Sequence, residues 1–322
     1  MQRFAVLGLT LALTTVAAIP QARADDFPSR PLRLIIGFPP GSAADITARL
    51  VGDVMSQTLG QQVVVEARPG AGSSLAAEFV ARAPADGYTL YIGTSSNVTN
   101  VAIGSNLRFD FGKDFAPITP LTGLPLILAV HPSLGVSSVK ELIALAKSKP
   151  GELTYASVGV GTVPHLSTEL FALRAGIKLI HVPYQGSPPA VTDLLGGRVS
   201  MMLGVASTIM PQVEAGQLKA LASGSAKRPH IAPNVPTIAE AALPGFEANV
   251  WFGLMAPAGT PRPVIDKLAA AANGALKTED VVSKLRKSGF EPLGGSPDQF
   301  AKFIASETVK WSDAAKAAEM KK

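Results

Sequence analysis

The sequence predicts an α/β protein of two lobes, with a mostly parallel sheet in each lobe. From Pro31 onward, short runs of β-type residues alternate with helical runs, and turns rich in Gly, Ser, Pro and Thr join them. This alternation is typical of βαβ units, whose strands pair in parallel. The chain has 322 residues. Because a single hydrophobic core stops growing near about 250 to 300 residues, we expect two lobes.

The first 24 residues form a segment of their own. Arg3 precedes an apolar run from Phe4 to Ile19, and "PQARA" follows, with small residues at Ala22 and Ala24. This order is typical of a secretory signal peptide, cleaved after Ala24. A transmembrane anchor is the alternative. The apolar run is shorter than the roughly 20 residues that a spanning helix needs, and a proline ends it.

Composition narrows the possible functions. Hydrophobic residues make up 47% and charged residues 16%, which excludes disorder, and no membrane span is expected beyond the N-terminus. Without cysteine the chain has no disulfide, thiolate or lipid-anchored cysteine, and together with the signal this indicates a bacterial periplasm. Removing Arg3 and Arg23 leaves 27 basic and 24 acidic residues, a mild charge of +3. With few aromatics and no basic tract, nucleic-acid binding is not expected.

The first lobe is predicted to open with alternating strands and helices. The strands are expected at 32–37, 62–67 and 88–93, and the helices at 46–59 and 73–83. The second lobe has the same rhythm, with strands at 126–131, 153–157, 178–184, 198–203 and 218–223 and helices at 138–149, 164–175, 188–195 and 208–215. Gly60 directly follows the first helix, where a glycine commonly ends a helix.

A long strand and three helices are predicted to return the chain to the first lobe. The strand is "FEANVWFGLMAP", residues 246–257, and the helices are expected at 261–276, 279–288 and 297–318. The predicted division is a signal peptide at 1–24, a first lobe of 25–122 and 246–322, and a second lobe of 123–245. Connections near 121–125 and 243–248 would cross between the lobes and can act as a hinge.

The loops after the strands indicate what the protein binds. In open parallel sheets ligands bind beyond the carboxyl ends of the strands, and these loops are "FPPGSAAD", "RPGAGSS", "GTSSN", "SVGVGT", "YQGSP" and "GVAST". They offer backbone groups and hydroxyls, and Asp45 is the charged side chain inside a turn. Helix starts of this kind bind anions through free N–H groups and the helix dipole, so several facing one cleft would suit a carboxylate. For any single loop, ordinary helix capping is the better explanation, and only the joint pattern of the loops favours a ligand site.

The sequence gives little support for an enzyme or a cofactor-binding protein. "GVGTVP" begins like a dinucleotide-binding loop, but Pro164 replaces the third glycine and no acidic residue follows near position 180. No phosphate-binding loop or nucleophile elbow occurs, and "SSVK" at 137–140 lacks the partner motifs of a serine acylase. The four histidines are scattered without ligand spacing, so we expect no cofactor and no metal site.

Three side chains near the loops have two interpretations each. His165 lies in the first turn after "GVGT", where it faces the cleft or has a structural role. Tyr184 either lines the wall of the pocket or is a packing residue of the fold. Asp45 bonds a ligand through water, or complements the helix dipole and braces its loop.

Five ordered blocks resemble a known family. "PSRPLRLIIGFPPGSAADITAR", "VVEARPGAGSSLAAEFVARAPADGYTL", "HVPYQGSPPAVTDLLGGRV", "LKALASGSAKR" and "VWFGLMAPAGTPRPVIDKL" resemble the successive signatures of the Bug family. Its members are the periplasmic solute receptors of tripartite tricarboxylate transporters. The similarity covers essentially the whole mature chain.

The resemblance implies a two-lobe, flytrap-like periplasmic binding protein of type II without catalysis. Such a receptor, expected here as a monomer, closes on a small organic acid and delivers it to a pair of membrane permease subunits. In the family, main-chain N–H groups and hydroxyls of two loops hold a ligand carboxylate, with ordered waters. By this resemblance, together with the loops and side chains already described, the candidate ligand-binding residues are Gly41, Ser42, Ala43, Asp45, Ala71, Gly72, Ser73, Ser95, Ser96, Ser157, Gly159, Gly161, Thr162, His165, Tyr184 and Ser207.

The sequence departs from the family pattern at three positions. Ser42 stands where a second glycine is usual, Gln185 where "YKG" is frequent, and Ser200 where an acidic residue often ends "GGxV". Ser42 adds a hydroxyl and Gln185 removes a cation from the cleft edge. We expect a dicarboxylate or a compact aromatic acid as ligand. The alternatives are an exported enzyme acting on small acids and a ligand-sensing receptor without a transporter.

Overall fold

A computed structural model describes residues 27–317 of the chain. The predicted signal peptide and its cleavage site lie outside these residues and stay a prediction. Among the residues described, every helix is too short or too polar to cross a membrane.

Three parallel strands form one end of the sheet in the first lobe. They are β1 (Leu32–Ile36), β2 (Val63–Ala67) and β3 (Thr89–Thr94), in the order β2-β1-β3. Helix α1 (Ala43–Leu59) follows β1, and α2 (Ser74–Ala81) follows β2, as the sequence predicts. Gly60 ends α1 in the left-handed conformation, with φ of 68°, which confirms its predicted role.

Helix α3 (Ser95–Ala102) follows β3 directly and was not predicted. Its sequence "SSNVTNVA" is made of residues with low helix propensity, which favour caps and turns. All but one of its residues are buried, and it packs against the C-terminal helix. Tertiary packing therefore forms this helix where the local sequence indicates only a loop.

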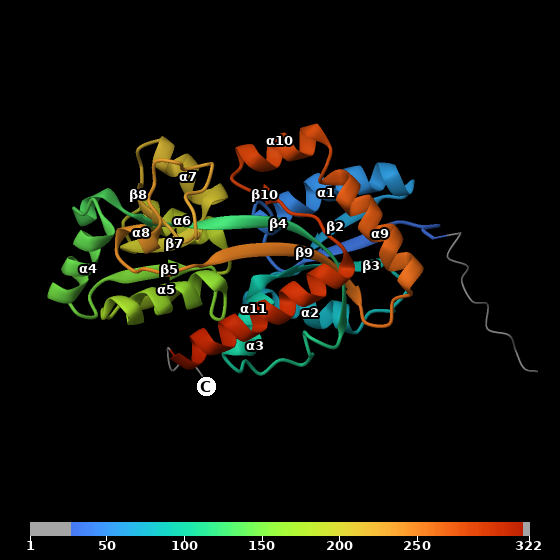
Figure 1. Cartoon of the computed structure of the whole chain (residues 1–322), viewed down its shortest axis with the longest axis horizontal. Coiled ribbons are helices and arrows are strands. Elements are labelled where there is room, and N and C mark those ends of the chain that lie inside the picture. The colour runs from blue at the N-terminus through green and yellow to red at the C-terminus, as the bar shows by residue number, and fades with distance from the viewer. Residues whose placement is uncertain (1–26, 318–322) are drawn as a thin grey trace, which may run out of the picture.

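The second lobe contains the predicted strands and helices in the predicted order. Strands β5 (Thr154–Ser157), β6 (Ile180–Pro183) and β7 (Met201–Val205) are parallel in the order β7-β5-β6, and β8 (Lys219–Ser223) pairs with none of these three. The helices are α4 (Val139–Ser148), α5 (Val163–Ala175), α6 (Ser187–Leu195), α7 (Ala206–Glu214) and the short α8 (Ile238–Ala241). Figure 1 shows this lobe in green and yellow at the left, and the blue first lobe at the right.

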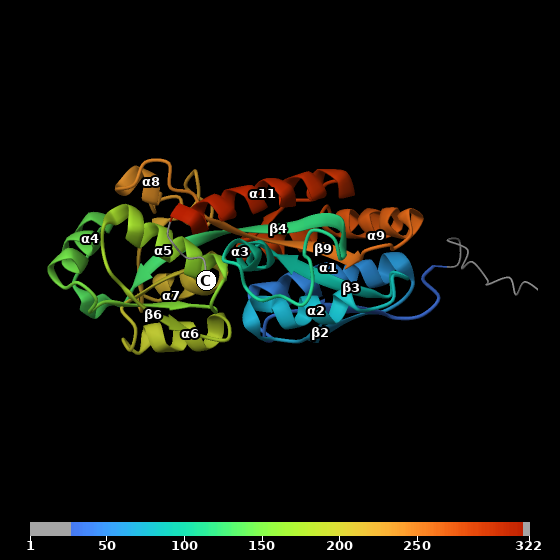
Figure 2. The same cartoon turned by 90° about the horizontal axis from the view of Figure 1, so that it is seen from below.

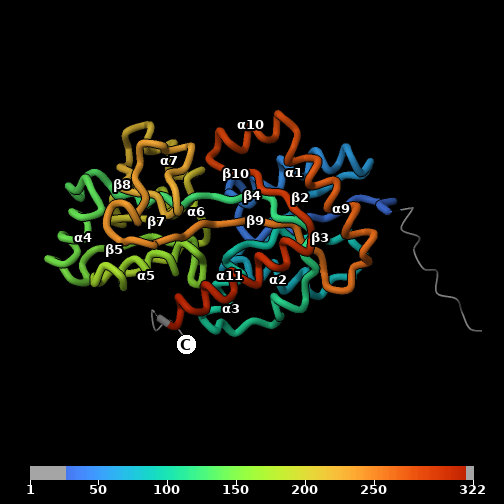
Figure 3. The backbone as a smooth tube through the Cα atoms, viewed as in Figure 1, coloured from blue at the N-terminus to red at the C-terminus, as the bar shows by residue number. Residues whose placement is uncertain are grey.

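Two long strands join the lobes. β4 (Phe115–Val130) pairs antiparallel with β9 (Asn249–Pro257) along its first part, and with β7 and β8 along its last part. The result is one mixed sheet of ten strands, parallel within the lobes and antiparallel along the crossing strands. Figure 3 shows the two crossing segments running side by side from one lobe to the other.

The extent of β4 corrects the sequence prediction. The strand expected at 126–131 begins at Phe115, so 121–125 is the middle of a strand rather than a short connection. Prolines at 117, 120 and 125 suggested a loop, because a proline cannot donate to a strand ladder. In the structure the pairing register shifts between Pro117 and Thr119 and between Pro120 and Thr122. Such irregularities accommodate the missing N–H groups.

The C-terminal segments cover the crossing strands. They are α9 (Arg262–Ala275), α10 (Glu279–Lys287), β10 (Glu291–Pro292) and α11 (Pro297–Ala317). α9 packs against α1, β10 pairs with β4, and α11 packs against both α3 and β4. In Figure 2 the red helix α11 runs along the green strand β4.

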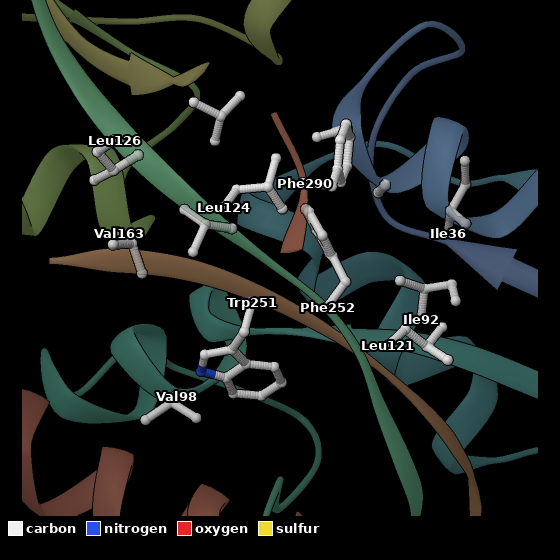
Figure 4. Close-up of a cluster of buried hydrophobic side chains, with 14 of the residues drawn as sticks. Ile36, Ile92, Val98, Leu121, Leu124, Leu126, Val163, Trp251, Phe252 and Phe290 are labelled. Atoms are coloured by element: carbon white, nitrogen blue, oxygen red, sulfur yellow. The ribbon is translucent and has the colours of Figure 1, made fainter. Parts of the chain in front are cut away.

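A large hydrophobic cluster surrounds the crossing strands. Figure 4 shows Leu121 and Leu124 of β4 beside Trp251 and Phe252 of β9, with the two aromatic rings on opposite faces of the strand. Phe300 of α11 is fully buried and meets the Trp251 ring edge to face, with centroids 5.6 Å apart. The fold therefore depends on α11 at the point where the lobes join.

Replacing Phe300 with Ala should lower the free energy of unfolding by about 3 to 5 kcal/mol, because it leaves a cavity against Trp251. Val309→Ala on the same helix is the control: that side chain is 62% exposed, and its loss should cost no more than about 0.5 kcal/mol. Urea unfolding followed by circular dichroism measures both. Equal stabilities of the two variants would contradict the importance of this contact.

Candidate functional site

A small cavity lies between the lobes where helices from both sides begin. Its volume is about 30 Å³. The first lobe contributes residues at the starts of α1 and α3 and from β9, and the second lobe contributes residues at the starts of α5, α6 and α7. The complete lining is Phe38, Ser42, Ala43, Ala44, Thr94, Ser96, Val158, Pro164, Ser187, Val205, Val250 and Phe252. None of these side chains carries a charge.

A second, more open groove adjoins this cavity. It has a volume of about 330 Å³, and Phe38 and Val158 line both spaces. Its walls are the segments 69–72 of the first lobe and 158–160 and 183–185 of the second. The groove brings together Ala71, Gly72, Gly159 and Tyr184. Here too, no lining side chain is charged.

The loop before α1 is held in shape by its own side chains. Gly41 has φ of 77°, a left-handed conformation that suits glycine. Its N–H donates to Asp45 Oδ2 at 3.0 Å, and Arg49 Nε donates to Asp45 Oδ1 at 2.9 Å. Both oxygens of the buried Asp45 carboxylate are therefore bonded within the chain, which favours bracing over ligand contact.

The first turn of α1 leaves backbone donors facing the cleft. Ser42 caps the helix, because its Oγ accepts from the N–H of Asp45 at 3.4 Å. The N–H groups of Ala43 and Ala44 donate to no acceptor within residues 27–317. Both residues line the cavity. Free N–H groups at a helix N-terminus, with the helix dipole behind them, form a binding site for an anion.

The loop before α5 bonds mainly to itself. Thr162 Oγ1 donates to the carbonyl of Gly159 at 2.7 Å, and the N–H of Gly159 donates to Ser157 Oγ at 3.2 Å. The N–H of Gly161 donates to His165 Nδ1 at 3.2 Å. The hydroxyls of Ser157 and Thr162 are thus used to shape the loop, and they line neither the cavity nor the groove.

Two stacked histidines support this loop from behind. The rings of His165 and His181 lie 4.2 Å apart, and Tyr155 stacks on the other side of His181 at 4.8 Å. His181 Nε2 hydrogen-bonds Ser157 Oγ at 2.6 Å. Burial lowers the pKa of both histidines to about 4, with the neighbouring His181 as a further cause for His165. Both rings are therefore neutral at pH 7.

The Ser157–His181 pair has the composition of a nucleophile and its base. Ser157 is fully buried, however, and its Oγ also bonds the backbone of Gly159. No carboxylate bonds His181 within the described residues, so the third group that orients a catalytic base is absent from them. The pair shapes the loop. Within the same range no three His, Asp or Glu side chains are placed to hold a metal ion.

The remaining candidate residues lie on both lobes. The Tyr184 hydroxyl donates to Asp193 Oδ2 at 2.6 Å, and burial with this bond raises the pKa of Tyr184 to about 12. Ser73 lies inward, 2.7 Å from the Tyr91 hydroxyl, and Ser95 Oγ accepts the N–H of Trp251. The predicted residues thus divide: Ser42, Ala43 and Ser96 line the cavity, Ala71, Gly72, Gly159 and Tyr184 line the groove, and Gly41, Asp45, Ser73, Ser95, Ser157, Gly161, Thr162, His165 and Ser207 lie outside both linings.

Two buried polar atoms beside the cleft have no partner among the described residues. They are Ser207 Oγ in the first turn of α7 and Asn97 Nδ2 in the first turn of α3. Asn97 is fully buried, and its Oδ1 accepts from Thr94 N and from the Tyr91 hydroxyl. Sequence reasoning missed Asn97, His181 and the apolar residues Phe38, Val158 and Phe252. Phe38, Val158 and Asn97 fall inside the predicted loops, which was the available signal for them, whereas His181 and Phe252 lie on the strands β6 and β9.

The two lobes touch around the cleft, so the structure is a closed form. Thr99 Oγ1 of α3 donates to the carbonyl of Gly161, and His230 of the second lobe pairs with Glu291 of β10. A Cβ on Gly161 would lie 2.0 Å from Asn100 Oδ1. The cavity has room for little more than one water molecule.

Two lobes on one sheet, closed over a cleft of helix N-termini, define the class of periplasmic binding proteins. Rpa4515 of R. palustris, solved with adipate, has a TM-score of 0.88 and 38% identity, over 91% of this chain and 99% of that one. MatC of Rhodopseudomonas palustris, solved with bound malate, has a TM-score of 0.85 and 33% identity, over 89% and 99% of the two chains.

The sequence comparisons give the family. The model of the tripartite tricarboxylate transporter family receptor matches residues 47–320. A protein from the tcbD-tcbE intergenic region of Pseudomonas sp. (strain P51) is 41% identical over 96% of this chain and 92% of its own length. BugT of Bordetella pertussis is 38% identical over 96% and 94%. The chain therefore belongs to this receptor family, which is a family of solute-binding proteins rather than enzymes.

Gly161→Ala should prop the lobes apart, because its Cβ would overlap Asn100, whose amide is held by Gly72 and Ser74. Gly216→Ala is the matched control, since Gly216 has φ of 72° against 79° for Gly161 and nothing within 4 Å of the added Cβ. Small-angle X-ray scattering should show a larger radius of gyration for Gly161→Ala alone. The same radius for both variants would count against this closing contact.

Acid should destabilise the protein partly through the two stacked histidines. Their folded pKa of about 4 lies below the ordinary 6.5, so the unfolded chain takes up protons first and stability falls as the pH drops from 6.5 to 4. Urea unfolding at several pH values should show a shallower fall for the His165→Gln/His181→Gln double variant. His131→Gln, outside the stack, should behave like the wild type. An unchanged pH dependence of the double variant would refute the interpretation.

Proposed function

We propose that the protein is a periplasmic receptor that captures a small dicarboxylate between its lobes and delivers it to a tripartite tricarboxylate transporter. The observation that carries the proposal is the convergence of helix N-termini from both lobes on one cleft without charged side chains. Receptors of this family supply the transporter context. An aromatic carboxylate is the second candidate ligand.

Charge and geometry support a carboxylate. The free N–H groups of Ala43 and Ala44 can donate to its oxygens, and the dipole of the 17-residue helix α1 favours the negative charge. With no cation in the lining, recognition would rest on fixed donors rather than on a flexible ion pair. A buried carboxylate left without donors carries a large desolvation cost, so only acids that fit these donors would bind.

The adjoining groove favours a ligand with two polar ends. Two relatives were solved with adipate and malate, which are both dicarboxylates. With one carboxylate at the start of α1, the other end would extend past Phe38 and Val158 toward the backbone of 70–72 and Tyr184. We propose the predicted residues of the cavity and the groove as direct contacts. The remaining predicted residues would act behind them or through water.

Closure would be a movement of the two predicted lobes, 25–122 with 246–322 against 123–245. The crossing strands β4 and β9 connect them, and the register shifts at the prolines of β4 are the places where that strand can bend. We further propose cleavage of the signal peptide after Ala24, a periplasmic monomer, and permease subunits as partners. A receptor that senses acids without a transporter is the alternative role, and an exported enzyme is the alternative class.

A thermal-shift screen of mono-, di- and tricarboxylates and aromatic acids tests the proposal. A true ligand at 100 times its dissociation constant should add about 2.7 kcal/mol to stability, and nuclear magnetic resonance should show it unchanged after release. Ser42→Leu should abolish the shift, because the larger side chain fills the cavity.

Ser138→Leu is the control for loss of a helix cap. Ser138 caps α4, where its Oγ accepts the N–H of Glu141 at 3.2 Å, and it lines neither the cavity nor the groove. Each substitution should cost about 1 kcal/mol of stability, but Ser138→Leu should bind normally. Stabilisation by neutral sugars and by no acid would rule out the carboxylate receptor. Turnover of an acid would favour the exported enzyme.

A further inference from the structure

Glu307 is a buried carboxylate of α11 that lies beside β9. It is 7% exposed and lies in the middle of α11. Its Oε2 accepts the indole N–H of Trp251 at 3.2 Å and the indole N–H of Trp311 at 3.1 Å. Its Oε1 accepts from Lys310 Nζ at 3.3 Å. The chain contains two tryptophans, and both donate to this one carboxylate.

Trp251 connects Glu307 with the cleft. It lies on β9 between Val250 and Phe252, and both of these residues line the cavity. Its own backbone N–H donates to Ser95 Oγ at 3.4 Å, and Ser95 opens α3, whose neighbours Thr94 and Ser96 also line the cavity. The Trp251 indole and backbone therefore join α11 to two walls of the ligand site.

The same residue lies where the lobes join. Trp251 pairs with Gly123 in the register of β9 and β4, the two strands that cross between the lobes. Phe300 and Phe303 of α11 meet its ring edge to face at 5.6 and 5.7 Å. Figure 4 shows the indole on the face of β9 opposite Phe252. A shift of the indole would thus move β9 at the crossing point.

The geometry points to Glu307 as a positioning residue for ligand binding. It lines a pocket of about 470 Å³ that shares Val250 with the cleft cavity, but Glu307 lines no part of the cavity itself, so it acts without touching the ligand. By fixing the Trp251 indole, it holds β9 and the start of α3 in the arrangement that the ligand requires. This inference rests on the proposed receptor function.

Isothermal titration with adipate and malate tests the role. Glu307→Ala removes the acceptor and leaves two buried indole N–H groups, so the affinity should fall about tenfold or more. Glu307→Gln keeps a hydrogen-bond acceptor without the charge, so its ligand affinity should fall less than that of Glu307→Ala. Trp251→Phe should reproduce the loss, and its combination with Glu307→Ala should add little, because both variants break the same bond between Trp251 and Glu307.

Two control variants distinguish a positioning role of Glu307 from a general effect on protein stability. Asp298→Asn makes the same charge change on α11 at an exposed side chain, and it should bind as the wild type does. Trp311→Phe removes an indole partner within α11 but keeps the bond to β9, so its affinity should change little although its stability falls. Trp311→Phe also leaves Trp251 as the single tryptophan. The emission of Trp251 should shift on ligand addition in the Trp311→Phe variant, but not in the double variant that also carries Glu307→Ala.

Each outcome decides one point. If the wild type binds neither acid nor any other carboxylate, the proposed function fails and this inference fails with it. If the wild type binds and both Glu307 variants bind equally well, the inference alone is overturned. Equal losses in Trp311→Phe and Trp251→Phe would also overturn it, because a general loss of stability would then explain both. Should Glu307→Ala not fold, Glu307→Gln and Trp251→Phe carry the same comparison.

Discussion

The antiparallel pairing of β4 with β9 is the constraint on which the rest of the structure depends. It makes one sheet of two lobes, and each lobe keeps a set of parallel strands whose carboxyl ends meet at the cleft. Because the helices that follow these strands begin at the same edge, their N-termini converge on one space. The crossing strands also contribute Val250 and Phe252 to the lining. The ligand site and the joint between the lobes therefore share residues, and α11 supports both from one side.

The absence of charge in the described lining has a consequence for how the site works. Side-chain cations are long and mobile, whereas backbone N–H groups at a helix start are held by the helix itself. Here a second layer of polar side chains keeps the loops in place: Asp45 braces the loop before α1, and the His165 and His181 rings brace the loop before α5. Both histidines are neutral at pH 7, because burial lowers their pKa values to about 4. Bonds within the protein therefore hold both loops in place.

Local pattern predicted most of the fold. The strands of both lobes and the helices that follow them were found because their apolar periodicity and turn residues agree with each other. The failures have a common cause in distant contacts. α3 has a sequence suited to turns and becomes helical by packing against α11, and the first half of β4 contains prolines that bulges accommodate. At the site, the loops were predictable from strand ends, but the bond of His181 to Ser157 joins residues from two strands, and no spacing in the sequence reveals it.

Closed geometry and a small cavity together limit what the receptor can recognise. Contacts such as Thr99 with Gly161 form only when the lobes meet, and in that state the cavity holds about 30 Å³. Under the proposed function, a bound acid would either keep the lobes slightly apart or extend into the adjoining groove of about 330 Å³. Under the proposed function, closure would be complete only for a ligand whose second end satisfies the groove. Selectivity would follow from the length of the acid and the position of its polar ends, since the fixed backbone donors of the two lobes cannot adjust to a poor fit.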